Sequence, residues 1–123
     1  MSGSINKVIL IGNLGKDPEI RYLESGVSVA NFSLATTESY NNKQGERVNQ
    51  TEWHNIVTWN KLADFSTEYL QKGQLIYVEG KLQTRTYKDK DDVQHWKTEV
   101  VVSTITPLEW KTVGKKENGS VKK

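Results

Sequence analysis

The pattern of apolar and polar positions predicts five strands and one helix along this chain. Residues 7–14, KVILIGNL, form the clearest strand, and alternate side chains make both of its faces apolar. Further strands are expected over 27–37, 52–59, 74–85 and 97–106. Gly80 interrupts the fourth strand, which predicts a bend or a bulge there. The polar stretch 39–51 is expected to be a loop or a long hairpin tip.

The segment between the third and fourth predicted strands has the chemistry of a helix. Asn60 can cap its first turn. Leu62, Phe65 and Tyr69 then form an apolar stripe at helical spacing, and Gly73 can end the helix in a left-handed conformation. Three strands, one helix and two more strands is the chain order of the five-stranded oligonucleotide-binding barrel, the OB-fold. We therefore predict an all-β protein with one helix, placed between strands 3 and 4.

Charge is distributed unevenly along the 123 residues. Residues 111–123 hold five lysines against one glutamate, a net charge of +4, whereas residues 1–110 carry 12 basic and 14 acidic side chains, a net charge of −2. We predict one folded domain over 1–110 and a short, basic, disordered tail over 111–123. Net charge alone gives no strong argument that the folded part binds nucleic acid.

The first strand predicts a partner subunit. Strands of a small antiparallel domain usually leave one face in water, yet Ile9 and Ile11 give this strand a second apolar face. A second copy of the chain is the simplest cover for that face, so we expect a homo-oligomer with Ile9 and Ile11 at its interface. An apolar share of 35% is also consistent with a domain that completes its core by oligomerising.

Several classes of function are disfavoured by what the sequence lacks. It has no cysteine, and its two histidines, His54 and His95, are not in a metal-ligand spacing. No glycine-rich phosphate loop is complete. We expect no enzyme activity, no metal and no cofactor. The sequence has no apolar run of signal-peptide or membrane-spanning length, so we expect a soluble, cytoplasmic, nucleoid-associated protein.

Aromatic and basic residues suggest a surface for unpaired nucleic acid. Trp53 and Trp59 have the same parity on one strand, so their side chains share a face. Two tyrosines near hairpin ends complete the candidate stacking set of Tyr40, Trp53, Trp59 and Tyr87. The candidate phosphate contacts are Lys7, Lys61, Lys72 and Arg85. Stacking needs no base readout, because every base has a π-face. The alternative is that both tryptophans are core residues, since large aromatic side chains are usually buried.

A collinear series of segments carries a family resemblance over residues 5–105. The segments are NKVILIGNLGKDPEIRY (6–22), VANFSLATTESY (29–40), QTEWHNIV (50–57), KLADFSTEYLQKGQLIYVEGKLQTRTY (61–87) and TEVVV (98–102). They closely resemble the bacterial single-stranded DNA-binding proteins, SSB. The resemblance implies an OB-fold homotetramer around which single-stranded DNA wraps.

The resemblance also assigns roles to residues. The four candidate stacking residues fall where the family places its base-stacking rings, although the family often has Trp at positions 40 and 87 and Phe at position 59. The four candidate phosphate contacts align with basic positions on the family's DNA-binding surface. His54 aligns with a position at the family's subunit interface. That is consistent with a histidine satisfied by hydrogen bonds in an interface or a core.

The C-terminus departs from the family pattern. Family members usually end in a long linker and an acidic tip that recruits replication and repair enzymes, whereas this sequence stops at Lys123 in a basic tail. Either the sequence is truncated or it is a variant without that recruiting function. We expect sequence-independent binding of single-stranded DNA during replication, recombination and repair. The alternative is an OB-fold protein-interaction module with weak or no DNA binding.

Overall fold

Six strands and one helix make up residues 3–110, the part of the chain that the computed structural model describes. In chain order the elements are β1 (Val8–Leu14), β2 (Glu19–Tyr22), β3 (Ser28–Asn41), β4 (Arg47–Trp59), α1 (Lys61–Tyr69), β5 (Leu75–Lys88) and β6 (Gln94–Pro107). The basic tail predicted over 111–123 lies outside the described residues. Within the described range, no helix combines the length and the apolar character that a bilayer crossing requires.

Five of the strands close into a barrel. β1 pairs with β5, β5 with β6, β6 with β4, and β4 with β3. The ring closes where β3 returns to β1, at Leu34 and Ala35. β4 and β6 run parallel, and the other pairs are antiparallel. A closed five-stranded barrel with one helix is the OB-fold, so the predicted fold class is confirmed.

The helix lies between the third and fourth strands of the barrel, as predicted, but between the fourth and fifth strands of the whole chain. α1 follows the fourth strand because β2, which was not predicted, precedes β3 and pairs with its first residues. β2 is only four residues long and three of them are exposed, so it has no apolar alternation to reveal it. A tight turn closes the β2–β3 hairpin through the backbone of Leu23, which bonds with Val27 and Gly26.

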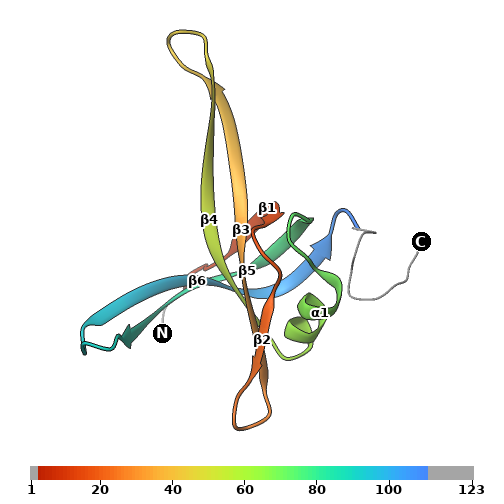
Figure 1. Ribbon diagram of the computed structural model, residues 1–123, viewed down its shortest axis with the longest axis vertical. Coiled ribbons are helices and arrows are strands. Elements are labelled where there is room, and N and C mark those ends of the chain that lie inside the picture. The colour runs from red at the N-terminus through yellow and green to blue at the C-terminus, as the bar shows by residue number, and fades with distance from the viewer. Residues whose placement is uncertain (1–2, 111–123) are drawn as a thin grey trace.

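Two long hairpin arms project from the barrel (Figure 1). The β3–β4 arm stays paired as far as Asn41 and Arg47. Of the two alternatives predicted for 39–51, the long hairpin is therefore right, and its turn covers residues 42–46. The β5–β6 arm stays paired as far as Lys88 and Gln94. Polar side chains cover the outer part of both arms. Backbone pairing therefore holds these two ribbons together, and no apolar alternation in the sequence predicts their outer parts.

The barrel core is formed by inward side chains from five strands and by α1. Leu34, Ile56, Ile76 and Val78 are essentially inaccessible to solvent, and Leu70 joins the same cluster just after α1. Burial of such side chains contributes on the order of 1.5–3 kcal/mol each. The core thus fixes the curvature of the strands whose outer faces carry the candidate site.

Asn60 does not cap α1 with its side chain, contrary to expectation. Its backbone instead has a positive φ of 56° together with a ψ of −123°. The buried Ser28 hydroxyl donates to the Asn60 carbonyl at 3.3 Å, which ties the start of the helix to β3. This backbone turn places Trp59 at the end of β4, immediately before the helix.

The bulge predicted at Gly80 is confirmed. The β5–β6 register shifts between Glu79 and Gly80. A Cβ at position 80 would collide with the Val101 carbonyl, so β5 and β6 come closer here than a side chain would allow. The bulge increases the local bend of β5, as a small closed barrel requires.

Candidate nucleic-acid interface

Trp53 carries a solvent-exposed indole, one edge of which packs against the barrel. It lies on β4 opposite Ala35, and 60% of its surface is exposed. One edge of the ring occupies the space that a side chain at Gly15 would need, next to the Ser33 hydroxyl. Glycine at position 15 therefore lets the indole lie close against the backbone. One edge of the indole thus lies against the backbone at Gly15, while most of its surface is exposed to solvent.

Trp59 lies six residues further along the same strand and is 39% exposed. Because side chains alternate along a strand, Trp53 and Trp59 have the same parity on β4, as predicted. Between them Asn55 is exposed, whereas Val57 is buried. Neither indole belongs to the barrel core, which excludes the alternative that both are core residues.

The two candidate tyrosines lie on different arms. Tyr40 is near the tip of the β3–β4 arm, opposite Val48, and is 51% exposed. Tyr87 is on the β5–β6 arm, opposite His95, and is 43% exposed. Among residues 3–110, no ring contact joins any two of the four candidate aromatics. The structure thus distributes these rings over the barrel wall and the two arms.

Two of the four candidate phosphate contacts already have carboxylate partners. Lys7 lies 3.1 Å from Glu79, whose other oxygen accepts a hydrogen bond of 2.9 Å from the Tyr77 hydroxyl. Arg85 binds Glu99 through two nitrogens, at 3.1 and 3.4 Å. These two cations would have to share or exchange their partners to contact a phosphate.

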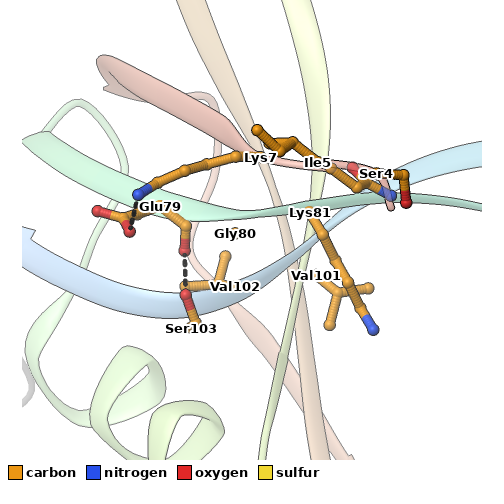
Figure 2. Close-up of a pocket in the computed structure, with 10 residues that line it drawn as sticks. Ser4, Ile5, Lys7, Glu79, Gly80, Lys81, Val101, Val102 and Ser103 are labelled. Carbon is orange, nitrogen blue, oxygen red and sulfur yellow. Dashed lines mark hydrogen bonds and ion pairs between the residues drawn. The ribbon is translucent and has the colours of Figure 1, made fainter. Parts of the chain in front are cut away.

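The Lys7 cluster has a clear electrostatic effect. The hydrogen bond from Tyr77, together with Lys7, lowers the pKa of Glu79, and the same hydrogen bond raises the pKa of Tyr77. Figure 2 shows Lys7 reaching toward Glu79 along an open groove of about 590 Å³, where the Ser103 hydroxyl donates to the Glu79 carbonyl at 3.1 Å. None of the four candidate stacking residues lines this groove.

Lys61 and Lys72 differ from this pair of cations. Within the described residues, neither side chain takes part in an ion pair. Lys61 is the first residue of α1, two positions after Trp59, and it is exposed. The backbone of Lys72 is held by Asp17, whose carboxylate accepts from the Lys72 amide at 2.7 Å. Both lysines can therefore approach a phosphate without breaking an ion pair.

The predicted interface residues occupy two places. Ile9 and Ile11 are on the outer face of β1 and are 55% and 54% exposed. The edge of β1 opposite β5 is mostly without backbone pairing among the described residues, since β3 pairs with it only at Asn13 and Leu14. His54 is on β4, half-buried, with its Nε2 2.9 Å from the Thr36 hydroxyl. The structure leaves the isoleucine face uncovered and gives His54 an internal partner.

His95, which was not among the predicted nucleic-acid contacts, is the ring neighbour of Tyr87. The His95 ring stacks on Tyr87, and its Nε2 lies 2.7 Å from Asp89. A hairpin centred on residues 89–93 places positions 87 and 95 opposite each other, so the spacing of the two residues could have predicted their contact. Within residues 3–110, no group of three or more His, Asp or Glu side chains is arranged to hold a metal ion.

The barrel with its exposed rings defines an OB-fold protein of the kind that presents aromatic side chains on an outer surface. Comparison with known proteins identifies the family. The chain belongs to the single-strand binding protein family, whose model matches residues 5–108.

Individual relatives agree with this family. The chain is 49% identical over 105 residues to single-stranded DNA-binding proteins of Neisseria meningitidis serogroup A (strain Z2491) and serogroup B (strain MC58). Each match covers 85% of this chain and 60% of the relative, so the chain spans about 60% of the length of these curated relatives. A solved structure of Plasmodium falciparum SSB in complex with ssDNA is similar with a TM-score of 0.78 and 35% identity. That match covers 89% of this chain and 99% of the other.

Proposed function

We propose that this chain binds single-stranded DNA without reading its sequence, by stacking bases on exposed rings and by contacting phosphates with basic side chains. The observation that carries the proposal is Trp53, which is 60% exposed while one edge of its ring lies close against Gly15. A fixed, open indole on an OB-fold barrel is a suitable base-stacking surface. The Plasmodium relative, solved with ssDNA, supports the same ligand.

The remaining candidate residues extend this surface. Trp59 lies on the same strand, and Tyr40 and Tyr87 continue it onto the two arms. Lys61 is two residues from Trp59, and Arg85 lies over the Tyr87 ring at 5.6 Å from its centroid. Base stacking with intervening cations is the arrangement that binds single strands with little base preference. The proposed role is non-catalytic and needs no metal or cofactor.

The proposed assembly is a homo-oligomer, by family resemblance a tetramer. Ile9 and Ile11 present an apolar face on β1, beside a strand edge that β3 covers only at Asn13 and Leu14. A second copy would bury that face, as obligate interfaces do. We further propose that the protein coats single strands exposed during replication, recombination and repair, and that it acts in the cytoplasm at the nucleoid.

One observation favours the second candidate, a protein-interaction module. Lys7 and Arg85 are both neutralised by glutamates, and residues 1–110 carry a net charge of −2. A surface of that kind attracts phosphates weakly at long range. A direct binding measurement separates the two candidates, because such a module would bind a protein and leave oligothymidine unbound.

The test is a tryptophan fluorescence titration with oligothymidines of several lengths. Stacking on Trp53 and Trp59 should quench the emission, and affinity should fall with salt at a slope of roughly −0.7 per phosphate neutralised. Light scattering on the same samples measures the oligomeric state. Unchanged emission and no mobility shift with a long oligothymidine at low salt would exclude DNA binding.

Two alanine variants make the test specific. Trp53→Ala should weaken DNA binding by about 1–3 kcal/mol, because it removes one stacked base contact. Trp110→Ala is the matched control, since Trp110 is 59% exposed but packs edge-on against Tyr69, after the last barrel strand. Equal losses in the two variants would mean that binding depends on exposed aromatic surface in general and not on the Trp53 site.

A further inference from the structure

A buried carboxylate binds two cations at the start of the β5–β6 arm. The side chain of Glu99 is 7% exposed and directly precedes Val100, the first residue of β6 that pairs with β4. Arg85 donates to both Glu99 oxygens, at 3.1 and 3.4 Å, and Lys97 Nζ lies 3.9 Å from one of them. Burial of a carboxylate is costly unless the carboxylate is paired. Arg85, Lys97 and Glu99 together form the Glu99 cluster, in which two cations against one carboxylate leave a net charge of +1.

The two cations of the Glu99 cluster face each other. Arg85 on β5 and Lys97 on β6 are direct cross-strand partners. Like charges in such positions destabilise a sheet, and the carboxylate next to them offsets part of that repulsion. Since one carboxylate does not neutralise two cations, one further anionic group is needed to balance the charge. A DNA phosphate carries a single negative charge and would make the cluster neutral.

Within residues 3–110, both cations keep N–H groups that have no hydrogen-bond partner. Arg85 binds Glu99 through Nε and Nη2, which leaves Nη1 unbound. A guanidinium presents five donors in a planar fork, so its other edge can bind a phosphate while the bonds to Glu99 remain. The 3.9 Å between Lys97 Nζ and Glu99 is longer than a hydrogen bond. Both side chains are accessible, Arg85 at 48% and Lys97 at 38%.

The Glu99 cluster lies on the same face of the sheet as two candidate stacking rings. Residues paired across a ladder point to the same side, so the β5–β6 register puts Arg85, Lys97 and Tyr87 on one face. The parallel β4–β6 pairing gives the odd-numbered residues of these two strands the same face, which includes Trp53. In the sheet, β6 lies between β4 and β5, and the two arms diverge from this region (Figure 1). The cluster is thus between the strand that carries Trp53 and the strand that carries Tyr87.

We propose that Arg85 and Lys97, held by Glu99, form one site for a DNA phosphate at the start of the β5–β6 arm. Lys97 is then a further binding residue, and Glu99 is a positioning residue that stays bound to Arg85 in the complex. This inference rests on the proposed function and states how one of its candidate phosphate contacts works. A guanidinium that is fixed before binding loses less conformational entropy when the phosphate arrives.

Salt titrations of oligothymidine binding test the contribution of each cation. The cluster neutralises a phosphate only while its net charge is +1, so Lys97→Ala and Arg85→Ala should each reduce the magnitude of the salt slope by roughly 0.7. At about 0.1 M salt, a slope change of that size corresponds to a loss of affinity of about fivefold. Lys97→Arg retains the charge and should retain the slope.

Lys81→Ala is the matched control for Lys97→Ala. Lys81 is an exposed lysine on β5 outside the Glu99 cluster, and within the described part of the chain it takes part in no ion pair. Lys81→Ala removes the same charge from the chain as Lys97→Ala does. It should leave both the slope and the affinity unchanged.

Removal of the whole cluster distinguishes one phosphate from two. A triple variant with Arg85→Ala, Lys97→Ala and Glu99→Gln has no charge at the site, so its slope should fall by no more than that of either single variant. A fall of roughly 1.4 would mean that the two cations bind separate phosphates, and the shared site would be wrong. A circular dichroism spectrum of each variant verifies that the barrel is intact.

The positioning role of Glu99 is tested by Glu99→Gln alone. This change raises the net charge of the cluster to +2 but replaces the carboxylate with a neutral amide. At about 0.3 M salt, charge is screened within roughly 6 Å, so the added charge has little long-range effect. Glu99→Gln should then weaken binding by about two- to fivefold, because Arg85 loses its paired contact. Equal or tighter binding would show that the carboxylate does not position Arg85.

NMR provides a readout of Glu99 that does not depend on affinity. In the unchanged chain the Arg85 Nε–H signal should be protected from exchange with solvent, both before and after oligothymidine binds, because Nε donates to Glu99 in both states. In Glu99→Gln the same signal should exchange faster. Loss of protection in the complex of the unchanged chain would mean that Arg85 exchanges Glu99 for the phosphate, which would overturn the positioning role.

The outcomes separate this inference from the proposed function. If the unchanged chain does not bind oligothymidine at any salt concentration, the proposed function fails. If it binds but Lys97→Ala keeps the full slope and affinity, the inference about Lys97 is wrong and the proposed function stands. Equal losses in Lys81→Ala and Lys97→Ala would likewise reject the site, because the effect would then follow total charge and not position.

Discussion

The two arms of the molecule share one turn design but surround their tyrosines differently. In the β3–β4 arm, Asn42 Oδ1 accepts from the amides two and four residues ahead, both at 2.9 Å. In the β5–β6 arm, Asp89 Oδ1 accepts from the amides in the same two relative positions. In each turn the fourth residue has a positive φ, 80° at Gly45 and 67° at Asp92. Similar backbone geometry is thus obtained from different residues.

The difference between the arms lies in the second polar atom of the turn side chain, an oxygen in Asp89 and an amide nitrogen in Asn42. Asp89 uses its second oxygen to hold His95 against Tyr87, which gives the β5–β6 arm a stacked pair of rings. Asn42 donates its amide N–H to Glu46 at 2.9 Å. Tyr40 lies opposite Val48, and within residues 3–110 it has no ring partner. One arm therefore couples its turn to its aromatic side chain, and the other does not. This contrast can be tested at the tyrosines, at the turns and at the carboxyl group.

The largest expected effect is on DNA affinity when either tyrosine is truncated. Tyr40→Ala and Tyr87→Ala should each weaken oligothymidine binding by about 1–3 kcal/mol, since each removes a stacking surface. The contrast is in the ring partner: Tyr87→Ala also removes the ring that stacks on His95, whereas among the described residues no ring contact is lost with Tyr40. Fluorescence titrations with oligothymidine measure the affinity of each variant. Unchanged affinity in either variant would mean that the tyrosine of that arm is not a stacking surface.

A smaller effect is expected from exchanging the residues with positive φ. Glycine occupies the left-handed region without steric cost, whereas Asp pays part of the penalty of an L-residue there. Asp92→Gly should therefore stabilise the β5–β6 arm by about 0.5–1 kcal/mol, and Gly45→Asp should destabilise the other arm by a similar amount. Hydrogen exchange of the amides at residues 93 and 46 reports the opening of each arm.

One exposed ion pair needs a control in that exchange. Lys88 lies 3.7 Å from Asp92, and Asp92→Gly also removes this contact. Exposed pairs of this type contribute roughly 0–1 kcal/mol. Lys88→Ala removes the ion pair and leaves the backbone of residue 92 unchanged. If Lys88→Ala and Asp92→Gly change the exchange rate equally, the backbone strain at Asp92 makes no contribution.

The same arms show which parts of the fold can be predicted from sequence. The strand around Ile76 was predicted because buried side chains at 76 and 78 alternate with partly exposed ones, and Gly80 marked its bulge. The outer arms were missed in part because most of their side chains are polar and exposed and their strands are held by backbone pairing. β2 was not predicted for a related reason, since its four residues show little apolar alternation.

The candidate site divides in the same way. Parity along β4 predicted one side of the strand for Trp53 and Trp59, and both indoles are exposed, although Val57, of the same parity, is buried. Ion-pair partners that depend on the register between distant strands could not be predicted from the sequence. Lys7 meets Glu79, and Arg85 meets Glu99, only because the strand pairings bring them together. That the aromatic and basic residues bind DNA remains a prediction for the titrations above.

The smallest expected effect concerns the acid stability of the two turns. Hydrogen bonds from His95 and from the Val93 amide lower the pKa of Asp89 in the folded arm. A lowered pKa means that the folded arm resists protonation. The contribution of the carboxylate is therefore complete above the ordinary value of about 3.9 and is lost as the pH falls through the lower folded value. Asn42 Oδ1 belongs to a neutral amide, so its hydrogen bonds to the turn amides should not respond to the pH.

Amide hydrogen exchange or NMR line positions between pH 2 and 5 can detect this difference. The Val93 amide should exchange faster relative to the Glu46 amide as the pH falls, because protonated Asp89 accepts hydrogen bonds less strongly. In Asp89→Asn the two arms should behave alike, since both turns then rest on a neutral amide oxygen. If the Val93 and Glu46 amides respond equally in the unchanged chain, the charge on Asp89 contributes nothing that Asn42 does not, and the coupling between turn and ring pair loses its electrostatic basis.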